Sequence, residues 1–372
     1  MTKLNELIQQ LCPNGIEHLL IGEIAEVGTG SSNGNEAEDE GKYPFFIRSQ
    51  TVKRINDYEY DDEAIIIPGE GGIGDIFHYV NGKYALHQRV YRIHFTDRRV
   101  NTKFAYHYMK GFFKSFIMRK AVSSTVISIR KPMIENFLIP IPPLPVQEEI
   151  VRILDNFTEL TAELTAELTA RKKQYEYYRD SLFAVDNTEI TWTTLDRISE
   201  NCDRQRRPVT KGNRVAGKYP YYGASGIVDY VADYIFDGDY LLVSEDGANL
   251  IARSTPIAFS ISGKNWVNNH AHVLKLDTYE LRRYVEIYLN AIDLSRYISG
   301  GAQPKLSQEN LNKIPIPVLS AERIKYVVSI LDRFDIFCND LTTGLPAEIA
   351  ARQKQYEYYR DKLLTFKEQK SK

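Results

Sequence analysis

Two stretches of the chain carry apolar residues at helical spacing. Between 146 and 183, apolar side chains recur mostly every three or four positions, and no Pro or Gly interrupts them. A helix of about 38 residues is about 57 Å long, and one with a single apolar stripe needs a partner helix. The second stretch runs from 319 to Leu363, and Gly344-Leu345-Pro346 predicts a break or kink within it.

The stretches before these two helices are mixed in pattern. Short apolar runs bounded by Gly, Asp or Pro, at 64–67 and 240–243, are typical of strands. Runs at 101–117 and 279–297 have helical spacing. The pattern therefore predicts an α+β chain in which each of two mixed globular modules is followed by a long helix.

The chain repeats itself after about 180 residues. Residues 171–182 read RKKQYEYYRDSL and residues 352–363 read RQKQYEYYRDKL, with ten of twelve positions identical. An Ile-Pro-Ile-Pro motif precedes both helices, and Lys-Tyr-Pro followed by two aromatic residues occurs once in each module. Between these points the modules share little. Similar helices and divergent modules suit a protein that presents one partner surface twice and carries two different reading heads.

These observations divide the chain into four parts. We place the first module at 1–143, the central helix at 144–184, the second module at 185–318 and the C-terminal helix, kinked near 344–346, at 319–372.

Composition narrows the function classes only slightly. The chain of 372 residues has a net charge of −2, which argues weakly against nucleic acid unless a basic footprint is local. Its three cysteines are far apart, so neither a disulfide framework nor a zinc site is expected. With no signal peptide and no membrane-length apolar run, we expect a soluble cytoplasmic protein.

Three motifs resemble chemical sites. The GEGGIG stretch at 69–74 matches a dinucleotide fingerprint but leaves no room for the helix that such a site requires. The GNRVAGKY stretch at 212–219 is a near match to a phosphate loop, with Tyr219 where Ser or Thr would hold magnesium. His270 and His272 have no carboxylate or cysteine at ligand spacing. We therefore expect no catalytic residue, no metal and no cofactor in this chain.

The same motifs resemble a known family. The Ile-Pro-Ile-Pro-Pro-Leu stretch, the helix start from Gln147 to Asp155 and the paired QYEYYRD ends are similar to the conserved regions of type I restriction-modification specificity subunits. Residues 42–50 and 218–226 resemble two of that family's recognition-domain types. The similarity spans nearly the whole chain. The two halves differ in one respect: the first contains a Glu-Leu-Thr-Ala repeat at 159–170 that the second lacks.

The resemblance implies a fold, a function and a set of partners. It implies two target-recognition domains, each reading one half of a split site in double-stranded DNA, joined by long helices that form an antiparallel coiled coil. It implies two methyltransferase subunits docked on the helices and holding S-adenosylmethionine, and restriction subunits that use ATP and magnesium. The chain itself would be a non-catalytic subunit.

Candidate DNA contacts are polar and basic loop residues, because such side chains reach base edges and phosphates. In the first module they are Arg48, Ser49, Gln50, Lys53, Arg54, Arg119, Lys120, Ser123, Ser124, Arg130 and Lys131. In the second they are Arg204, Arg206, Arg207, Lys211, Tyr221, Tyr222, Ser225, Asn268, Asn269, His270, Gln303 and Lys305. The candidate partner-binding residues of the helix ends are Tyr175, Tyr178, Arg179, Tyr356, Tyr359 and Arg360.

Two other functions remain open at this point. The first is a coiled-coil scaffold that joins proteins without reading DNA, which the divergent polar modules disfavour. The second is a nucleotide-dependent enzyme built on the two glycine motifs.

We further hypothesise that the repeat at 159–170 is a ruler that sets the gap between the two DNA half-sites. The sequence does not give the DNA target.

Overall fold

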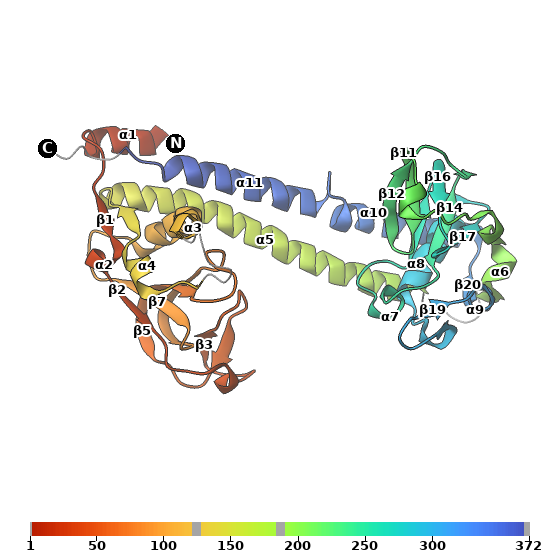
Figure 1. Ribbon diagram of the computed structural model, residues 1–372, viewed down its shortest axis with the longest axis horizontal. Helices are drawn as coiled ribbons and strands as arrows, with labels where there is room; N and C mark the ends of the chain where they lie inside the picture. The colour runs from red at the N-terminus through yellow and green to blue at the C-terminus, as the bar shows by residue number, and fades with distance from the viewer. Residues whose placement is uncertain (1, 121–127, 184–189, 368–372) are drawn as a thin grey trace. The chain divides into compact units, whose positions relative to one another are not determined.

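The computed structural model describes residues 2–120, 128–183 and 190–367 (Figure 1). The chain forms two compact units. The first comprises residues 1–167 and 346–372, and the second comprises residues 168–345. The predicted boundaries differ from these units, because the central helix contributes to both of them.

The first unit contains a mixed sheet of six strands and a separate sheet of two strands. Its strands are β1 (His18–Leu20), β2 (Ala25–Thr29), β3 (Tyr43–Phe46), β4 (Lys53–Ile55), β5 (Tyr60–Pro68), β6 (His78–Leu86), β7 (Val90–Phe95) and β8 (Leu138–Pro140). Its module helices are α1 (Thr2–Leu11), α2 (Ile21–Ile24), α3 (Thr102–Lys120) and α4 (Lys131–Glu135), with a 3-10 turn at Gly34–Glu36. Six strands pair in the order β2-β7-β5-β6-β3-β4, and β3 runs parallel to β6.

Alternation along β5 explains why this sheet has a core on both faces. Ile65 and Ile67 belong to the cluster that includes the apolar side chains of α3, whereas Ala64 and Ile66 belong to a second cluster with Phe46 and Tyr84. Successive side chains of a strand point to opposite faces, so four consecutive apolar residues serve both cores.

The second unit repeats this plan with more and shorter strands. They are β9 (Thr191–Thr194), β10 (Glu200–Asn201), β11 (Ala216–Gly223), β12 (Gly226–Val231), β13 (Phe236–Asp237), β14 (Tyr240–Ser244), β15 (Ala258–Ile261), β16 (Lys264–Val267), β17 (Ala271–Lys275), β18 (Ile298–Ser299), β19 (Lys305–Leu306) and β20 (Pro315–Val318). The helices are α6 (Leu195–Ile198), α7 (Asn249–Ala252), α8 (Tyr279–Ala291) and α9 (Gln308–Asn312), with 3-10 turns at Asp203–Gln205, Lys211–Asn213 and Ser295–Tyr297. Two sheets, β10-β17-β14-β15 and β12-β11-β16-β13, again include one parallel pair, β11 with β16.

The long helices follow the predicted pattern. Helix α5 (Leu144–Phe183) has 40 residues. It packs antiparallel to α11 (Leu345–Leu363) in the first unit and antiparallel to α10 (Ala321–Asn339) in the second (Figure 1). In place of a kink near 344–346, α10 ends and a new helix begins, with Pro346 in its first turn, where a missing N–H costs little.

The Ile-Pro-Ile-Pro motifs form strands. β8 pairs with β1 and β20 pairs with β9, so each motif closes its module before the long helix begins. Among the described residues, no helix is long and apolar enough to cross a membrane.

Candidate nucleic-acid interface

A short turn between two strands has the same backbone frame in both modules. It comprises residues 87–89, between β6 and β7, and residues 268–270, between β16 and β17. The strand before each turn lies parallel to the strand of the repeated Lys-Tyr-Pro motif. The first residue of the turn donates its backbone N–H to that neighbouring strand, at 3.0 Å to Phe46 and 3.1 Å to Tyr222. We call these residues the matched turns.

The first side chain of each matched turn fixes the turn from within. Nδ1 of His87 accepts the backbone N–H of Arg89 at 3.1 Å, and Oδ1 of Asn268 accepts that of His270 at 2.8 Å. His87 and Asn268 are only 8% and 6% exposed, whereas the second and third residues of both turns are exposed. An imidazole and a carboxamide thus have the same structural role, and the outward positions are left free to differ.

A loop with an acidic residue runs beside each matched turn, at 69–71 and 245–247. Its first residue donates a backbone N–H to the carbonyl of the last residue of the turn, at 2.9 Å in both modules. The same first residue accepts a backbone N–H through its carbonyl, from Ile129 in one module and from Leu306 in the other, each at 2.8 Å. We call these segments the acidic loops.

The acidic residue of each loop forms an ion pair with the last residue of the matched turn. Glu70 contacts Arg89 at 2.8 Å, and Asp246 contacts His270 at 2.9 Å. The next residue is glycine in both loops, with φ of +72° and +109°, a region that residues with a side chain rarely adopt. The two modules therefore share a turn, a loop and an ion pair, with different side chains in each.

In the first module a second arginine joins this pair. Arg48, which follows β3, contacts Glu70 at 3.1 Å, and the hydrogen bonds from Arg89 and Arg48 hold the pKa of the Glu70 carboxyl below its usual range. A pocket of about 320 Å³ opens here, lined by Gly34, Ile47, Arg48, Glu70, Gly71 and His87. It offers a concave surface, lined by both polar and apolar groups, next to the matched turn.

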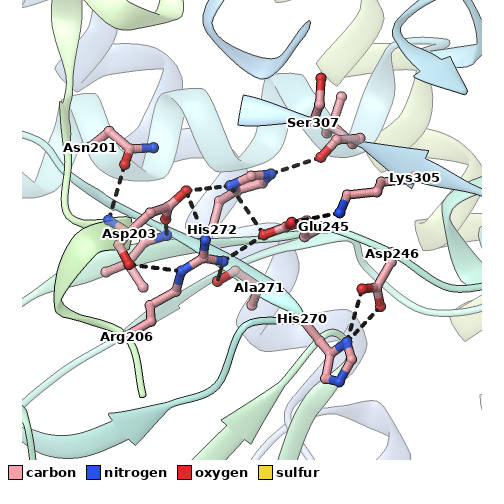
Figure 2. Close-up of polar contacts among 12 residues, drawn as sticks. Asn201, Asp203, Arg206, Glu245, Asp246, His270, Ala271, His272, Lys305 and Ser307 are labelled. Carbon is pink, nitrogen blue, oxygen red and sulfur yellow. Dashed lines mark hydrogen bonds and ion pairs between the residues drawn. The ribbon is translucent and has the colours of Figure 1, made fainter. Parts of the chain in front are cut away.

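In the second module a buried charge network supports the acidic loop (Figure 2). His272 is 1% exposed, with Nδ1 at 2.6 Å from a carboxylate oxygen of Asp203 and Nε2 at 2.8 Å from the Leu306 carbonyl oxygen. Burial raises the pKa of Asp203, but the hydrogen bond and charge of His272, the backbone N–H of Val273 and the charge of Arg206 together outweigh burial, so the pKa is lowered. Arg206 contacts Glu245 at 2.6 Å and the Ala271 carbonyl at 2.8 Å, which anchors the start of the loop.

This network bears on the question of a metal ion. Ligand atoms of Asp203, Glu245 and His272 lie within 4.8 Å of one another, a proximity that the sequence spacing did not reveal. Both carboxylates, however, already pair with cations, since Arg206 contacts each and Lys305 contacts Glu245 at 3.3 Å. Both ring nitrogens of His272 already have a protein oxygen within hydrogen-bond distance. The cluster therefore fits an ion network that shapes the loop.

The glycine motifs are turns. No helix begins in 69–74, where Gly71, Gly72 and Gly74 have positive φ. At 212–219, a 3-10 turn ends at Asn213 and β11 begins at Ala216, so the helix that a phosphate loop requires does not follow.

The structure separates the candidate DNA contacts into two exposed or partly exposed groups and a third group whose side chains are buried or held in contacts within the module. Beside the matched turns and acidic loops lie Arg48, Ser49, Tyr222, Ser225, Asn269, His270, Gln303 and Lys305. Exposed elsewhere on the modules are Gln50, Lys53, Arg54, Arg119, Arg130, Lys131, Arg204, Arg207 and Lys211. Ser123, Ser124 and the side chain of Lys120 lie outside the described part of the chain.

Three of these candidates need correction. Asn268 is 6% exposed and its side chain accepts a backbone N–H of its own turn. Tyr221 is 1% exposed and its hydroxyl accepts the backbone N–H of Val209. Arg206 is held in the buried network. Arg54 is exposed and stays a candidate, although its guanidinium also donates to backbone carbonyls of 41 and 42. Sequence reasoning missed Glu70, Gln88, Arg89 and Asp246, although an acidic residue followed by glycine occurs in both halves.

A second matched arrangement connects each module to its long helices. In the first unit, His107 on α3 donates from Nε2 to Asp155 of α5 at 2.9 Å and accepts at Nδ1 from the hydroxyl of Tyr356 on α11 at 3.1 Å. Lys103 contacts the same carboxylate at 2.7 Å. We call Lys103, His107, Asp155 and Tyr356 the first latch.

The second unit has the same arrangement with other side chains. Arg283 on α8 donates to Asp332 of α10 at 2.7 Å and also pairs with Asp335. The Tyr279 hydroxyl donates to Asp332 at 2.7 Å. Asp155 and Asp332 occupy equivalent positions of the repeat, in the two copies of Ile-Leu-Asp.

The latches correct the candidate partner-binding residues. Tyr356 is 2% exposed, Tyr359 stacks on Phe157 with ring centroids 5.3 Å apart, and Tyr175 packs near Phe334. These rings hold the helix pairs together. Arg179 and Arg360 are partly buried beside Asp180 and Asp361, and Tyr178 is 40% exposed.

The most exposed tyrosines of the repeated motif are Tyr177 and Tyr358, at 69% and 61%. They occupy the same position of the two copies and were not among the candidates.

Comparison with known proteins matches this doubled layout. The family described as "Type I restriction modification DNA specificity domain" matches residues 13–171 and again 189–351. The chain belongs to this family. Each match runs through one module and into the helix that follows it, which is the repeat that the structure shows twice.

Named members of the specificity family share part of the chain. A putative type I restriction enzyme specificity subunit of Haemophilus influenzae is 35% identical over 188 residues, covering 50% of this chain and 48% of that protein. The EcoR124I/EcoR124II specificity subunit of Escherichia coli is 34% identical over 248 residues, covering 60% of each chain. The alignments thus span about half to three fifths of these relatives.

Solved structures share the fold over nearly the whole length. The S subunit of a type I restriction-modification system from M. genitalium matches with a TM-score of 0.66 at 18% identity, covering 94% of this chain and 96% of that one. A chain from a structure of type I system assembly and conformational transition matches with a TM-score of 0.54 at 13% identity, covering 95% and 98%.

Proposed function

We propose that this chain is the DNA-reading, non-catalytic specificity subunit of a type I restriction-modification complex, and that its two modules read the two halves of a bipartite target. The observation that carries the proposal is the matched turn. Its backbone frame is the same in both modules, while its exposed side chains differ. A pair of reading heads needs a constant frame and variable side chains.

The exposed chemistry of the modules supports DNA as the ligand. The matched turns carry amide, guanidinium and imidazole groups, which form hydrogen bonds with base edges. Exposed Lys and Arg elsewhere on the modules suit phosphates. The net charge of −2 leaves room for a basic surface that is local.

We further propose the partners of this family for this chain. Two methyltransferase subunits would dock on the two copies of the QYEYYRD motif, each meeting Tyr177 or Tyr358, and would hold S-adenosylmethionine. Restriction subunits would supply ATP- and magnesium-dependent chemistry. The assembly would act in the cytoplasm, where the three free cysteines, Cys12, Cys202 and Cys338, would remain reduced.

A selection experiment tests the proposal. The chain is reconstituted with its methyltransferase subunits and S-adenosylmethionine, and incubated with a pool of duplexes of random sequence. Methylated molecules are then sequenced. The proposal predicts enrichment of one bipartite sequence. A scaffold that reads no DNA would give no sequence enrichment, and methylation by the chain without its partners would contradict a non-catalytic role.

A further inference from the structure

The middle residues of the matched turns, Gln88 and Asn269, occupy one equivalent position. Each lies between a buried first residue that locks the turn and a third residue held by an ion pair. Both middle residues are exposed. The frame therefore presents the middle side chain of each turn on a rigid support, while its two neighbours already make contacts within the module.

Local contacts make the first of these positions rigid. The backbone N–H of Gln88 donates to the Ser32 carbonyl at 3.0 Å, and its Nε2 donates to Oδ1 of Asn33 at 3.0 Å. A carboxamide has two N–H donors and one acceptor oxygen, so this bond orients the group while using one donor. A pre-oriented amide loses little freedom on binding.

The chemistry of the two side chains is shared. Both end in a carboxamide, which pairs in the major groove with the donor and the acceptor of an adenine edge. Resting on the proposed function, we propose that Gln88 and Asn269 are the base-reading residues of this position, each recognising one adenine in its own half of the target. The ion pairs Glu70–Arg89 and Asp246–His270 hold the turns at the required orientation.

Methylation by the reconstituted complex tests the inference. Relative rates are measured on the selected target and on all its single-base variants, for the wild type, Gln88→Ala and Asn269→Ala. Gln88→Ala should reduce discrimination at one base pair of one half-site by about tenfold or more and leave the other half unchanged. Asn269→Ala should give the reciprocal result in the other half.

Two further variants separate reading from structure. Gln88→Glu replaces a donor-acceptor pair with acceptors only, so the preferred base at that position should change from adenine toward cytosine. Loss of folding cannot produce a new preference. The controls are Gln10→Ala on α1 and Asn339→Ala at the end of α10, both exposed amides outside the matched turns, and they should keep the wild-type profile.

The outcomes distinguish this inference from the proposed function. If the wild type shows no sequence preference, the proposed function fails. If the wild type reads a bipartite target but Gln88→Ala and Asn269→Ala keep its profile, only this inference fails. A rate that falls equally on every sequence would assign both residues to phosphate contact and would also refute it.

Discussion

Removing Asp155 should loosen the first module from its helices. Asp155 accepts hydrogen bonds from His107 and Lys103, and His107 is buried between α3, α5 and α11. The variant Asp155→Ala leaves the buried Nε2 of His107 without an acceptor. Lys103 can turn to water, because its side chain is 43% exposed. The penalty is therefore concentrated on one imidazole.

The magnitude follows from the burial of that group. A buried donor that loses its partner costs about 1–3 kcal/mol, whereas an exposed ion pair contributes about 0–1 kcal/mol. Asp75–Lys114, with an N–O distance of 2.7 Å and side chains 58% and 49% exposed, provides a matched control in the same unit. Asp75→Ala should change the stability of the unit little. Asp155→Ala should destabilise α3 and the adjoining part of α5.

Hydrogen exchange measures this locally. Amides of α3 that exchange through opening of the latch should exchange faster in Asp155→Ala. A penalty of about 1–3 kcal/mol corresponds to roughly 5- to 150-fold, because every 1.4 kcal/mol or so is a factor of ten. Tyr356→Phe removes the hydroxyl group that donates to His107. Combined with Asp155→Ala, it should destabilise the unit by less than it does alone, because both substitutions act on one network. Equal exchange in Asp155→Ala and Asp75→Ala would refute the reasoning.

The first latch also predicts a pH dependence. Burial lowers the pKa of His107, so below about pH 6.5 the unfolded chain binds a proton that the folded chain resists. Stability contributed by neutral His107 is therefore present above about pH 6.5 and is lost as the pH falls toward the folded pKa. The hydrogen bond from His107 also lowers the pKa of Asp155, whose contribution is lost only at lower pH, below about 3.9. A His107→Gln variant should show a smaller decline below about pH 6.5 than the wild type, as followed by exchange of the α3 amides. Part of the decline should remain, because burial also lowers the pKa values of His78 and His87 in the same unit. An unchanged decline would contradict this assignment.

Two other predictions concern the helices. Tyr177→Ala and Tyr358→Ala should each weaken the binding of one methyltransferase subunit by about 1–2 kcal/mol. Native mass measurement should then show one bound subunit where the wild type shows two. Tyr326 is exposed on α10 outside the motif, and the control variant Tyr326→Ala should bind both subunits. Full binding of both subunits by the first two variants would contradict a docking role for these tyrosines. Deleting residues 163–166 shortens α5 by about 6 Å and rotates the rest of the helix by about 40°. The unread gap between the two half-sites should then be shorter by about one base pair, and the half-site sequences should not change, as mapping of the methylated sites would show. An unchanged gap with full activity would rule out the ruler.

The helices could be predicted from the sequence because helical periodicity is a local property. The stripe between 146 and 183 corresponds to α5, which begins two residues earlier, and the interruption at 344–346 corresponds to the start of α11. The periodicity did not separate the exposed tyrosines of the motif from the packed ones. Tyr175 packs against the core of the second unit, whereas Tyr178 is 40% exposed and Tyr177 is 69% exposed.

The matched turns could not be predicted because they depend on strand register. Glu70 and Arg89 are 19 residues apart and meet because β5 pairs with β7 so that Pro68 lies opposite Val90. In the second module Ser244 lies opposite Ala271 in the same way. Aligning GEGGIG with SEDGAN by sequence differs from this register by one residue, which conceals the equivalence of Glu70 and Asp246.

Module exchange tests the central claim most directly. Residues 190–318 are replaced by the second module of another family member, and the methylated bases produced by the reconstituted complex are mapped. Two independent reading heads predict that one half of the target changes to the donor's sequence while the other half stays as in the wild type. A change in both halves, or in neither, would contradict the account.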